Sequence, residues 1–356
     1  MSLRVVVAMS GGVDSSVAAA LLTEAGHEVI GLSMQLYDQR DAPDAFGSCC
    51  SLDDLHDARR VAHRLGIPHY IVQLEAQFDA AVVRNFVSEY ARGRTPIPCV
   101  HCNADLKFHH LLERAAGFGA AAVATGHYAR VQYDEAARRY RLYRGVDAAK
   151  DQSYFLFSLT QAQLAHALFP IGDLVKSDVR RIAARHRLAV ADKPDSHEIC
   201  FIPDGDAAGF VERALGDAST DGEIVDSAGR TLGRHRGVHR FTVGQRKGLG
   251  VATGTPLYVL RLEPRESRVV VGAREELGGC ELTASSVNWI AGAPPSGPIR
   301  VAARIRHRHR EAPAGLTPVG DARAQVVFDE PQLAITPGQA VVFYDDEEVV
   351  GGGWID

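Results

Sequence analysis

The stretch LRVVVAMSGGVDSSVAAALLTEAG, residues 3–26, joins an apolar run to an Ala/Leu-rich segment through a loop of small residues. Residues 3–9 are short and rich in valine, which predicts a buried β-strand. The apolar spacing over 14–25 predicts a helix that ends at Gly26. Between them, Gly11 and Gly12 let backbone N–H groups converge at a helix N-terminus, and this arrangement is typical of an anion-binding site.

One acidic residue distinguishes this loop from the best-known phosphate loop, which ends in Gly-Lys-Ser/Thr. This loop has no lysine and carries Asp14 instead. A carboxylate repels phosphate unless Mg²⁺ lies between them or the acid caps the helix, and both roles are open for Asp14. The hydroxyls of Ser10, Ser15 and Ser16 can add hydrogen-bond donors. The alternative is a strand–turn–helix in which the glycines only allow the chain to turn and bind no anion.

Strands and helices alternate through the first 130 residues. We predict strands at 3–9, 27–34, 67–74 and 120–128, and helices at 14–25, 51–66, 78–93 and 104–117. This alternation predicts a parallel sheet covered on both faces. Ligands of such sheets bind at the carboxyl ends of strands, where the glycine loop, Met34 and the segment TGHY (125–128) all fall.

The pattern changes after residue 130. We predict a hairpin over 130–145, helices at 161–168 and 176–187, and a polar loop over 191–202. Short strands and glycine turns dominate from about 205, and β-type runs alone from about 280, which suggests a small barrel. The predicted fold class is therefore α/β: a parallel-sheet domain over 1–204, a central β-rich domain over 205–278 and a C-terminal β-barrel over 279–356.

The composition is that of an ordinary soluble protein. The chain has 356 residues, 46% hydrophobic and 23% charged, with a net charge of −5. This charge argues against a protein that simply coats nucleic acid. We find no signal-peptide layout and no apolar run long enough to span a bilayer, so we expect a cytoplasmic protein with reduced or reactive cysteines. Cys49 and Cys50 are expected to be structural, and Cys280 to be core.

Three of the cysteines are candidates for chemistry. Cys99 and Cys102 form a C-x-x-C on a predicted loop just before a helix, where the pKa of a thiol tends to fall. Cys200 lies in the polar loop that follows residue 191. A C-x-x-C is also compatible with a redox pair or with a tetrahedral zinc site, whose fourth ligand could be His101 or His197.

The glycine loop, S-G-G-x-D-S, resembles the pyrophosphate loop of the ATP pyrophosphatases, which release pyrophosphate and leave AMP on a substrate oxygen. Further motifs in order resemble the tRNA-specific 2-thiouridylase family. They are MSGGVDSSVAA (9–19), GRTPIPCVHCN (93–103), LKF (106–108), ATGHYAR (124–130), KDQSYFL (150–156), HEICFIPDGD (197–206), GQRKGLG (244–250) and ITPGQAVVFY (335–344). The resemblance implies a pyrophosphate-loop domain, a small central domain and a C-terminal β-barrel.

The implied activity is ATP- and Mg²⁺-dependent placement of sulfur on C2 of the wobble uridine of tRNA, after adenylation of O2. By resemblance, Cys102 is the nucleophile and Cys200 carries persulfide sulfur. The resemblance assigns ATP binding to Ala8, Met9, Ser10, Gly11, Gly12, Val13, Asp14, Ser15, Met34 and Gly126. It assigns tRNA contacts to Ile97, Pro98, His127, Lys150, Asp151, Gln152, Arg306, His307 and Gln339.

The chain departs from the better-known family pattern, which has Asn and Asp where this chain has Ile97 and Cys99. The departure puts the role of that aspartate at the target base in doubt and adds a third thiol. Cys99, Cys102 and Cys200 could hold a [4Fe-4S] cluster with one iron left for sulfide. Two sulfur routes follow, a persulfide relay from a sulfur-donor protein and a cluster that binds sulfide, and Cys99 favours the cluster. A Cys102–Cys200 disulfide is expected on oxidation.

Two basic stretches, 234–248 and 304–310, offer positive charge to tRNA. Regular strand alternation would place Arg304, Arg306, Arg308 and Arg310 on one face, where they suit phosphates and make binding salt-sensitive. The alternative is an ordinary solvated strand face. We expect tRNA as the partner, with its base extruded into a pocket, and neither DNA nor a membrane.

Two other functions compete. One is a pyrophosphate-loop ligase acting on a small molecule, which would need an amine source and no cysteine pair. The other is a non-catalytic RNA-binding metalloprotein. Release of AMP and pyrophosphate only in the presence of tRNA would exclude the second.

Overall fold

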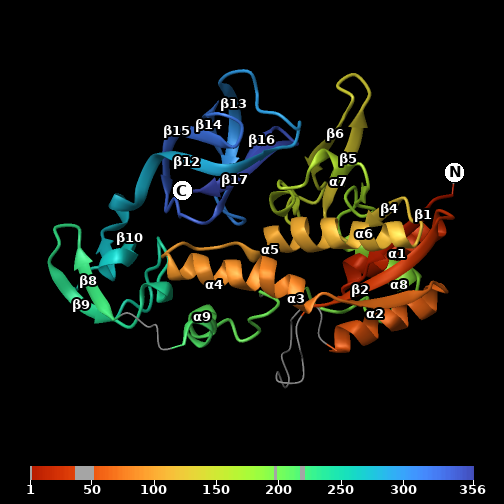
Figure 1. Cartoon of the computed structure of the whole chain (residues 1–356), viewed down its shortest axis with the longest axis horizontal. Helices are drawn as coiled ribbons and strands as arrows, with labels where there is room; N and C mark the ends of the chain where they lie inside the picture. Colours follow the sequence, from red (N-terminus) through yellow and green to blue (C-terminus); the bar gives the residue numbers. More distant parts are fainter. Residues whose placement is uncertain (1, 37–51, 196–198, 217–220) are drawn as a thin grey trace.

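A computed structural model of the chain describes residues 2–36, 52–195, 199–216 and 221–356 (Figure 1). Its first sheet is parallel throughout, as predicted. The spatial order is β3 (His69–Gln73), β2 (Glu28–Gln35), β1 (Arg4–Ala8), β4 (Ala122–Ala124) and β7 (Ala167–Leu168). In the part of the chain that the structure describes, no helix is long and apolar enough to cross a membrane.

Strand β1 is a continuous apolar run because helices cover both of its faces. Val5 and Val7 pack in one cluster with α1 (Val13–Glu24), α2 (Leu52–Leu65) and α8 (Lys176–Arg185). Val6 packs on the opposite face with α6 (Leu111–Gly117). Both faces of the strand are thus buried, which confirms the predicted α/β class.

The helix that carries the C-x-x-C begins earlier than predicted. Instead of a loop that leads to a helix at residue 104, α5 (Pro98–His101) runs directly into the π-helical segment η2 (Cys102–His110) and then into α6. Pro98 occupies the first helical position, where its missing N–H leaves no intrahelical bond unmade. Both cysteines therefore lie on a helix rather than on a loop.

The apolar run 161–168 is not one helix as predicted. Helix α7 (Gln161–Leu164) is a single turn that Thr160 and Gln163 close with a capping box. The chain then turns and forms β7, which pairs with β4 and completes the sheet. Short apolar runs are ambiguous between helix and strand, and here pairing with a neighbouring strand decides.

The remaining long helix is formed by α3 (Glu75–Phe78), the π-turn η1 (Asp79–Val83) and α4 (Arg84–Ala91). It packs against α9 (Ala207–Leu215), which lies where we predicted mainly short strands and glycine turns. Asp206 caps α9 by accepting a hydrogen bond of 2.9 Å from the backbone N–H of Gly209.

The central domain is a small sheet at the opposite end of the molecule from the parallel sheet (Figure 1). Its strand order is β10 (Tyr258–Glu263), β11 (Arg268–Gly272), β8 (Gly222–Asp226) and β9 (Thr231–His235). One core of buried valine, leucine, isoleucine and phenylalanine side chains lies on it.

The C-terminal part is an antiparallel barrel, as predicted, closed by the pairing of its first and last strands. Its strands are β12 (Gly278–Trp289), β15 (Arg323–Leu333), β14 (Ala312–Pro318), β13 (Ile299–Arg304), β16 (Ala340–Asp345) and β17 (Glu348–Ile355). The prediction that Cys280 is core was wrong: its side chain is exposed beside a bulge in β12.

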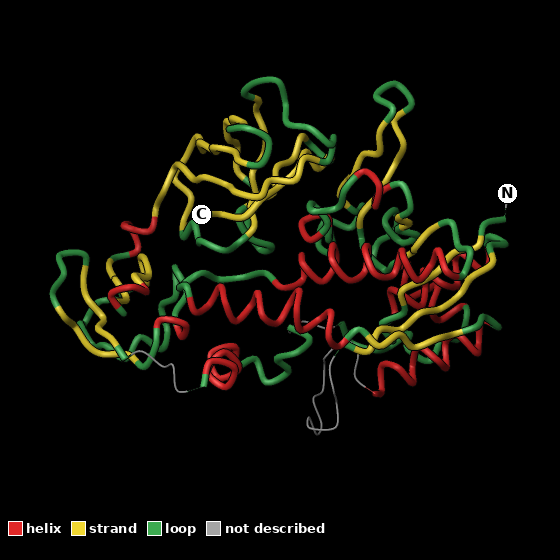
Figure 2. The backbone as a smooth tube through the Cα atoms, in the orientation of Figure 1, coloured by secondary structure: helices red, strands yellow, loops and turns green. Residues whose placement is uncertain are grey.

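The barrel is fused to the α/β domain rather than tethered to it. The predicted hairpin, β5 (Ala129–Asp134) and β6 (Arg139–Arg144), pairs with β17 and extends the barrel sheet. A single apolar cluster joins Tyr154 and Phe157 of the α/β domain to Val342 of the barrel. The tube in Figure 2 shows the strands of the barrel above the helices of the α/β domain. The ends of the barrel strands can therefore contribute directly to a site on the parallel sheet.

Asn288 of β12 makes the connection specific. Its amide donates to the backbone carbonyls of Phe157 at 2.7 Å and of Leu159 at 3.0 Å. We predict that Asn288→Ala lowers the free energy of unfolding by about 1–3 kcal/mol, because two carbonyls lose their donor in a mostly buried contact. Urea unfolding followed by fluorescence measures the change.

The matched control is Thr283→Ala on the same strand, whose side chain is exposed. It should unfold at the same urea concentration as the wild type. Equal midpoints for both variants would mean that the Asn288 amide does not hold the barrel to the α/β domain.

Candidate functional site

A cavity of about 690 Å³ lies at the carboxyl ends of β1, β2 and β4. It collects residues from the glycine loop, η2, the segment after β4, the loop 148–155, the polar loop after α8 and the barrel. Predicted site residues on its lining are Ala8, Met9, Ser10, Gly12, Val13, Asp14, Ser15, Met34, Cys102, Gly126, His127, Lys150, Asp151, Gln152, Cys200 and His307.

Close packing fixes the glycine loop. Gly11 has a φ of +75°, and a Cβ there would lie 2.2 Å from the carbonyl oxygen of Asp54. Gly12 is the N-cap of α1, and its carbonyl oxygen accepts a hydrogen bond of 2.8 Å from the hydroxyl of Ser16. A Cβ on Gly126 would lie 2.5 Å from the backbone nitrogen of Ser15. The N-terminus of α1 therefore faces the cavity beside the end of β4, as an anion site requires.

Asp14 does not cap the helix, so that alternative was wrong: no side chain caps α1. Both carboxylate oxygens accept hydrogen bonds of 2.8 Å from Nζ of Lys176, the first residue of α8. The hydroxyl of Tyr128 donates to Asp14 at 2.8 Å. Burial, followed by the negative charge of Asp14, raises the pKa of Tyr128 far above its usual value, so the hydroxyl keeps its proton.

A second acid extends this network. Asp195 accepts hydrogen bonds from Lys150 at 2.6 Å and lies 2.7 Å from Nζ of Lys176. Burial alone would raise the pKa of Asp195, but the hydrogen bonds from Lys150 and Lys176 lower it to about 2. Asp195 is thus ionised at neutral pH and connects the polar loop to α8.

Lys193 anchors the same polar loop to the glycine loop. Its Nζ donates to the carbonyl oxygen of Gly11 at 3.2 Å, to Asp54 at 2.6 Å and to Asp57 at 2.7 Å. Burial alone would lower the pKa of Lys193, but its bonds to the two acids raise it. The ammonium group is therefore charged and ties α2, the glycine loop and the polar loop together.

The two cysteines with assigned roles meet at this cavity although they are far apart in sequence. Cys102 and Cys200 are both half-buried, line the cavity and pack against the apolar cluster of β1 and α6. Phe201 fixes the chain next to Cys200, because its ring packs at 5.5 Å from Phe78 and 5.2 Å from Phe86. Cys99 is exposed and is not part of the lining.

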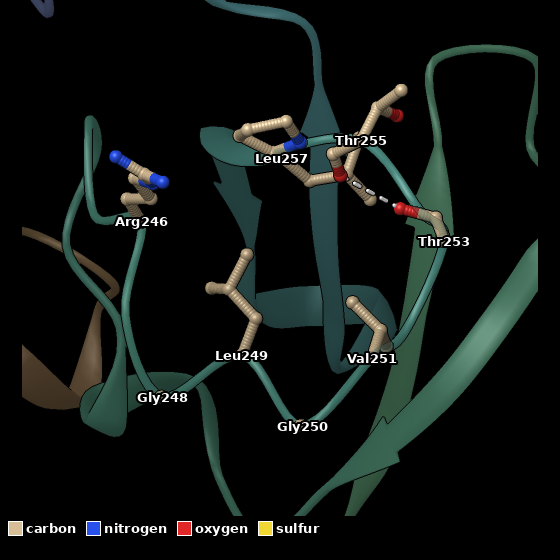
Figure 3. A pocket seen from close by; sticks show the side chains of 9 residues that line it. Arg246, Gly248, Leu249, Gly250, Val251, Thr253, Thr255 and Leu257 are labelled. Atoms are coloured by element: carbon tan, nitrogen blue, oxygen red, sulfur yellow. Dashed lines mark hydrogen bonds between the residues drawn. The ribbon is translucent and has the colours of Figure 1, made fainter.

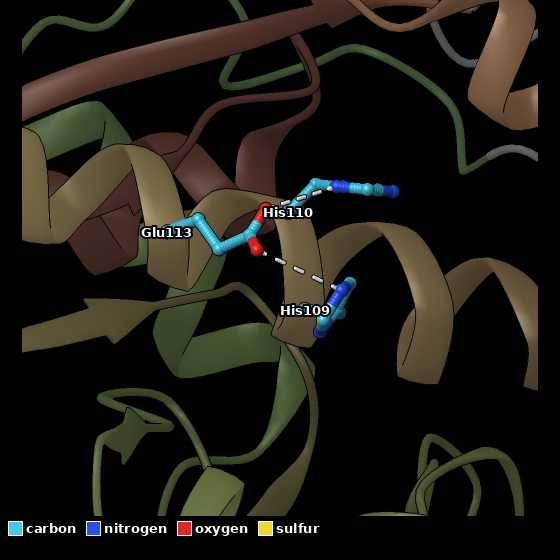
Figure 4. Close-up of side chains that lie close together, drawn as sticks. All are labelled: His109, His110 and Glu113. Carbon is cyan, nitrogen blue, oxygen red and sulfur yellow. Dashed lines mark hydrogen bonds and ion pairs between the residues drawn. The ribbon is translucent and has the colours of Figure 1, made fainter.

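Within the described residues, the geometry does not support the zinc hypothesis with His101 as the fourth ligand. Among the described residues, the group with three ligand atoms within 4.8 Å of one another is His109, His110 and Glu113, on the outside of the η2–α6 helix (Figure 4). His101 stacks on Trp354 at 4.9 Å instead. His197, Cys49 and Cys50 lie outside the described residues.

Several predicted tRNA contacts are buried in the cavity wall. His127 bonds to the hydroxyl of Thr125 at 2.7 Å, and burial, together with the charge of Lys107, holds its pKa well below its usual range. Asp151 is 4% exposed, and its carboxylate accepts hydrogen bonds from Ser153. Lys150, Gln152 and His307 also face the cavity.

Other predicted tRNA contacts lie outside the cavity lining. Pro98 is buried, and Ile97 packs against the apolar cluster that joins the α/β domain to the barrel. The amide of Gln339 donates to the carbonyl of Thr95 at 2.9 Å. Arg306 donates to the carbonyl of Leu333 at 3.1 Å. Their contacts in this structure connect loops of the protein to one another.

The predicted arginine stripe was wrong, because β13 ends at Arg304 and the chain then turns. The turn brings Arg304, His307 and Arg308 into the cavity lining. His307 lies against the ring of Phe155, with centroids 4.5 Å apart. The barrel therefore supplies one wall of the site, which strand alternation could not reveal.

Several side chains of the candidate site were not predicted from the sequence. Lys193 and Asp195 lie in the polar loop ADKPDSHEIC, and Tyr128 ends the segment TGHY, so both motifs were found but these roles were not. Lys176 and Lys107 lie on helices, and only the fold brings Lys176 to Asp14 and Lys107 to the cavity. The missed residues of the site are Lys107, Tyr128, Phe155, Lys176, Lys193 and Asp195, whereas Arg304 and Arg308 were predicted as phosphate contacts but on a regular strand face.

A smaller pocket of about 220 Å³ lies in the central domain (Figure 3). It is lined by the glycine-rich loop from Gly248 to Leu257 and by Arg246. Arg246 and Gly248 belong to the predicted basic stretch 234–248, and the rest of the lining follows that stretch directly. Part of that stretch is already neutralised, because Arg240 pairs with Glu212 at 2.6 Å. This pocket is separate from the cavity at the glycine loop.

Three consecutive segments of the chain match family models of known proteins. Residues 3–204 match the family described as "tRNA methyl transferase HUP domain", 208–273 the "tRNA methyl transferase PRC-barrel domain" and 280–355 the "Aminomethyltransferase beta-barrel domain". A solved 4-thiouridine synthetase in complex with RNA and ATP is similar at 16% identity and a TM-score of 0.36, over 60% of this chain and 53% of that chain.

Curated relatives match along almost the whole length. The tRNA-specific 2-thiouridylase MnmA of Solibacter usitatus is 56% identical over 366 residues, covering 99% of this chain and 99% of the relative. The enzyme of the same name from Geotalea uraniireducens is 54% identical, covering 99% and 95%. Identity at this level over 99% of this chain establishes common descent, and the chain belongs to the tRNA-specific 2-thiouridylase family.

Proposed function

We propose that this chain catalyses ATP-dependent 2-thiolation of the wobble uridine of tRNA. The observation that carries the proposal is that Cys102 and Cys200 line the same cavity as the glycine loop. Nucleotide bound at the loop can activate an oxygen as a leaving group, and thiols beside it can deliver the sulfur that replaces it. The names of the relatives supply the substrate: a tRNA whose uridine receives sulfur at C2.

In the first step, O2 of the uracil attacks the α-phosphorus of ATP. The bond between that phosphorus and the bridging oxygen to the β-phosphate breaks, pyrophosphate leaves, and the proton of N3 is lost. The backbone N–H groups at the start of α1 are the donors for the departing pyrophosphate. Both carboxylate oxygens of Asp14 are already bonded to the ammonium of Lys176, so Asp14 is poorly suited to hold Mg²⁺ as well. Mg²⁺ that arrives with ATP would neutralise phosphate charge.

In the second step, the terminal sulfur of a Cys200 persulfide attacks C2, and AMP leaves with O2. The Cys102 thiolate then attacks Sγ of Cys200 and breaks the sulfur–sulfur bond. The sulfur stays on C2, N3 regains a proton, and a Cys102–Cys200 disulfide remains. A dithiol reductant and a persulfide-bearing donor protein complete the cycle.

An iron–sulfur cluster is the other candidate source of sulfur. Thiolates of Cys99, Cys102 and Cys200 are suitable ligands, and such a cluster would supply an iron that binds sulfide. Cys102 and Cys200 face the cavity, whereas Cys99 is exposed and outside its lining. The two-cysteine route therefore fits the geometry better, and the cluster is kept as the hypothesis to be tested against it.

The side chains that the barrel contributes to the cavity are suited to binding tRNA. Arg304 and Arg308 bring positive charge to the cavity lining, and Phe155 with His307 offers ring surface to a base. A uracil must leave its stack to reach Cys102, and aromatic and arginine side chains are the usual receivers of an extruded base. A tRNA substrate also fits the cytoplasmic location expected from the sequence.

The cavity argues against the competing functions. A ligase for a small molecule needs no thiols beside its nucleotide loop, and neither does the methyl transfer that the descriptions of two matching families name. A sulfur transfer uses both Cys102 and Cys200, so thiolation accounts for more of the site.

The first prediction concerns the products. Incubated with ATP, Mg²⁺, a persulfide donor, a dithiol and unmodified tRNA, the protein should form AMP, pyrophosphate and 2-thiouridine in equal amounts, because adenylation and displacement are coupled. Liquid chromatography of nucleotides and of digested tRNA measures all three. A tRNA with cytidine at the wobble position is the control. Equal AMP release with this control would refute a uridine-specific reaction.

The second prediction concerns the two cysteines. Cys102→Ser and Cys200→Ser should each lower the thiolation rate by about 1,000-fold or more, since each removes a sulfur that takes part in the bond changes. Both variants should bind an ATP analogue as the wild type does. Cys280→Ser, which alters an exposed cysteine of the barrel, is the matched control and should keep full activity.

The third prediction separates the two sulfur routes. Protein purified without oxygen should contain no stoichiometric iron or acid-labile sulfide, and Cys99→Ser should retain persulfide-dependent thiolation within about threefold, because Cys99 is outside the cavity lining. Elemental analysis and the thiolation assay test both points. Stoichiometric iron that disappears in Cys99→Ser together with activity would establish the cluster instead.

A further inference from the structure

The glycine loop has no lysine of its own, yet a lysine lies on its acid. Nζ of Lys176 is 2.8 Å from each carboxylate oxygen of Asp14, from a position 162 residues later in the chain. The usual phosphate loop carries its lysine in the loop itself. Here the positive charge comes from the first residue of α8.

Lys176 is held from several sides. Its backbone N–H donates to the carboxylate of Asp147 at 2.8 Å, and its Nζ lies 2.7 Å from Asp195. The ammonium also lies over the ring of Tyr128, 5.9 Å from its centroid. The side chain is 14% exposed. These contacts hold the ammonium in one well-defined position beside Asp14, outside the cavity lining.

The position of Asp14 makes this charge necessary. Its carboxylate is in the first turn of α1 and lines the cavity, where the phosphates of a nucleotide would approach the helix N-terminus. An unneutralised carboxylate would repel them by Coulomb interaction and would offset the attraction of the helix dipole. Lys176 does not line the cavity itself, so its charge reaches a ligand through Asp14.

We propose that Lys176 is a positioning residue for nucleotide binding, which orients and neutralises Asp14 so that the glycine loop accepts a polyphosphate. The inference rests on the proposed function in that ATP is the ligand of the loop. It adds that a distant helix supplies the charge that the loop lacks. The ammonium of Lys176 also pairs with Asp195, which in turn pairs with Lys150 in the cavity wall. The charges that surround the glycine loop therefore form one network with those of the cavity wall.

The experiment measures binding of the ATP analogue AMP-PNP by calorimetry in EDTA, so that no metal intervenes. Lys176→Met should weaken binding about tenfold or more, since Asp14 then faces the phosphates without its partner. Lys176→Arg should bind within about threefold of the wild type. Arg181→Met is the matched control on α8, where Arg181 is exposed and pairs only with Asp178 among the interactions described, and should have no effect.

A double-mutant cycle tests the route through Asp14. In the Asp14→Asn background there is no carboxylate to neutralise, so adding Lys176→Met should change the affinity by less than about threefold. Binding by Lys176→Met equal to the wild type would overturn the inference. An equally large loss in both backgrounds would also overturn it, because Lys176 would then act on the ligand directly or through the fold.

Thermal unfolding of every variant accompanies the titrations. If Lys176→Met does not fold, Lys176→Gln takes its place in the same cycle and is judged by the same criteria. The wild type is also titrated with Mg²⁺ present. Wild-type protein that binds AMP-PNP under neither condition would refute nucleotide binding at this loop, and with it the proposed function. Binding by the wild type only with Mg²⁺ would overturn the role of Lys176, because the metal rather than the ammonium would then offset Asp14. Binding by the wild type together with equal binding by Lys176→Met would refute the role of Lys176 alone.

Discussion

The site depends on the contact between the end of β4 and the start of α1. Gly126 lies so close to the Asp14–Ser15 peptide that a side chain cannot fit, since its Cβ would be 2.5 Å from the nitrogen of Ser15. This contact fixes the helix N-terminus at the carboxyl edge of the sheet, where donor groups of the backbone point into the cavity. It also places Tyr128, two residues later, within hydrogen-bonding distance of Asp14. This one close backbone contact therefore positions both the glycine loop and the acidic side chain of Asp14 with its partners.

The second requirement is that the barrel is part of the site. The apolar core shared by Tyr154, Phe157 and Val342 leaves little freedom between barrel and parallel sheet. The turn after β13 consequently presents Arg304 and His307 to the same cavity as the glycine loop. A barrel on a flexible linker could bind RNA, but it could not form a fixed wall for one base beside a nucleotide.

The sequence predicted the fold class and the local motifs well, because both depend on short-range patterns. The alternation of strands and helices, the junction around Gly11 and the barrel followed from periodicity and turn residues. What failed depends on distant partners: β7 is a strand only because β4 pairs with it, and the stripe beginning at Arg304 breaks because β13 ends there. The charge partners of the site were out of reach for the same reason. Nothing near Lys176 in sequence indicates that it meets Asp14.

The cavity contains acidic side chains although the protein acts on ATP and tRNA, which are both polyanions. Unpaired acids would repel these ligands, and the net charge of the chain, −5, would add to the repulsion. Each acid on the described lining, however, has a basic partner. The pairs are Asp14 with Lys176, Asp54 with Lys193, Asp151 with Arg304 and Asp195 with Lys150. A paired carboxylate holds a lysine or arginine in place while adding little net repulsion of its own. The acids therefore serve to position the cations, and the potential that a polyanion meets is set by these local pairs rather than by the net charge of the chain.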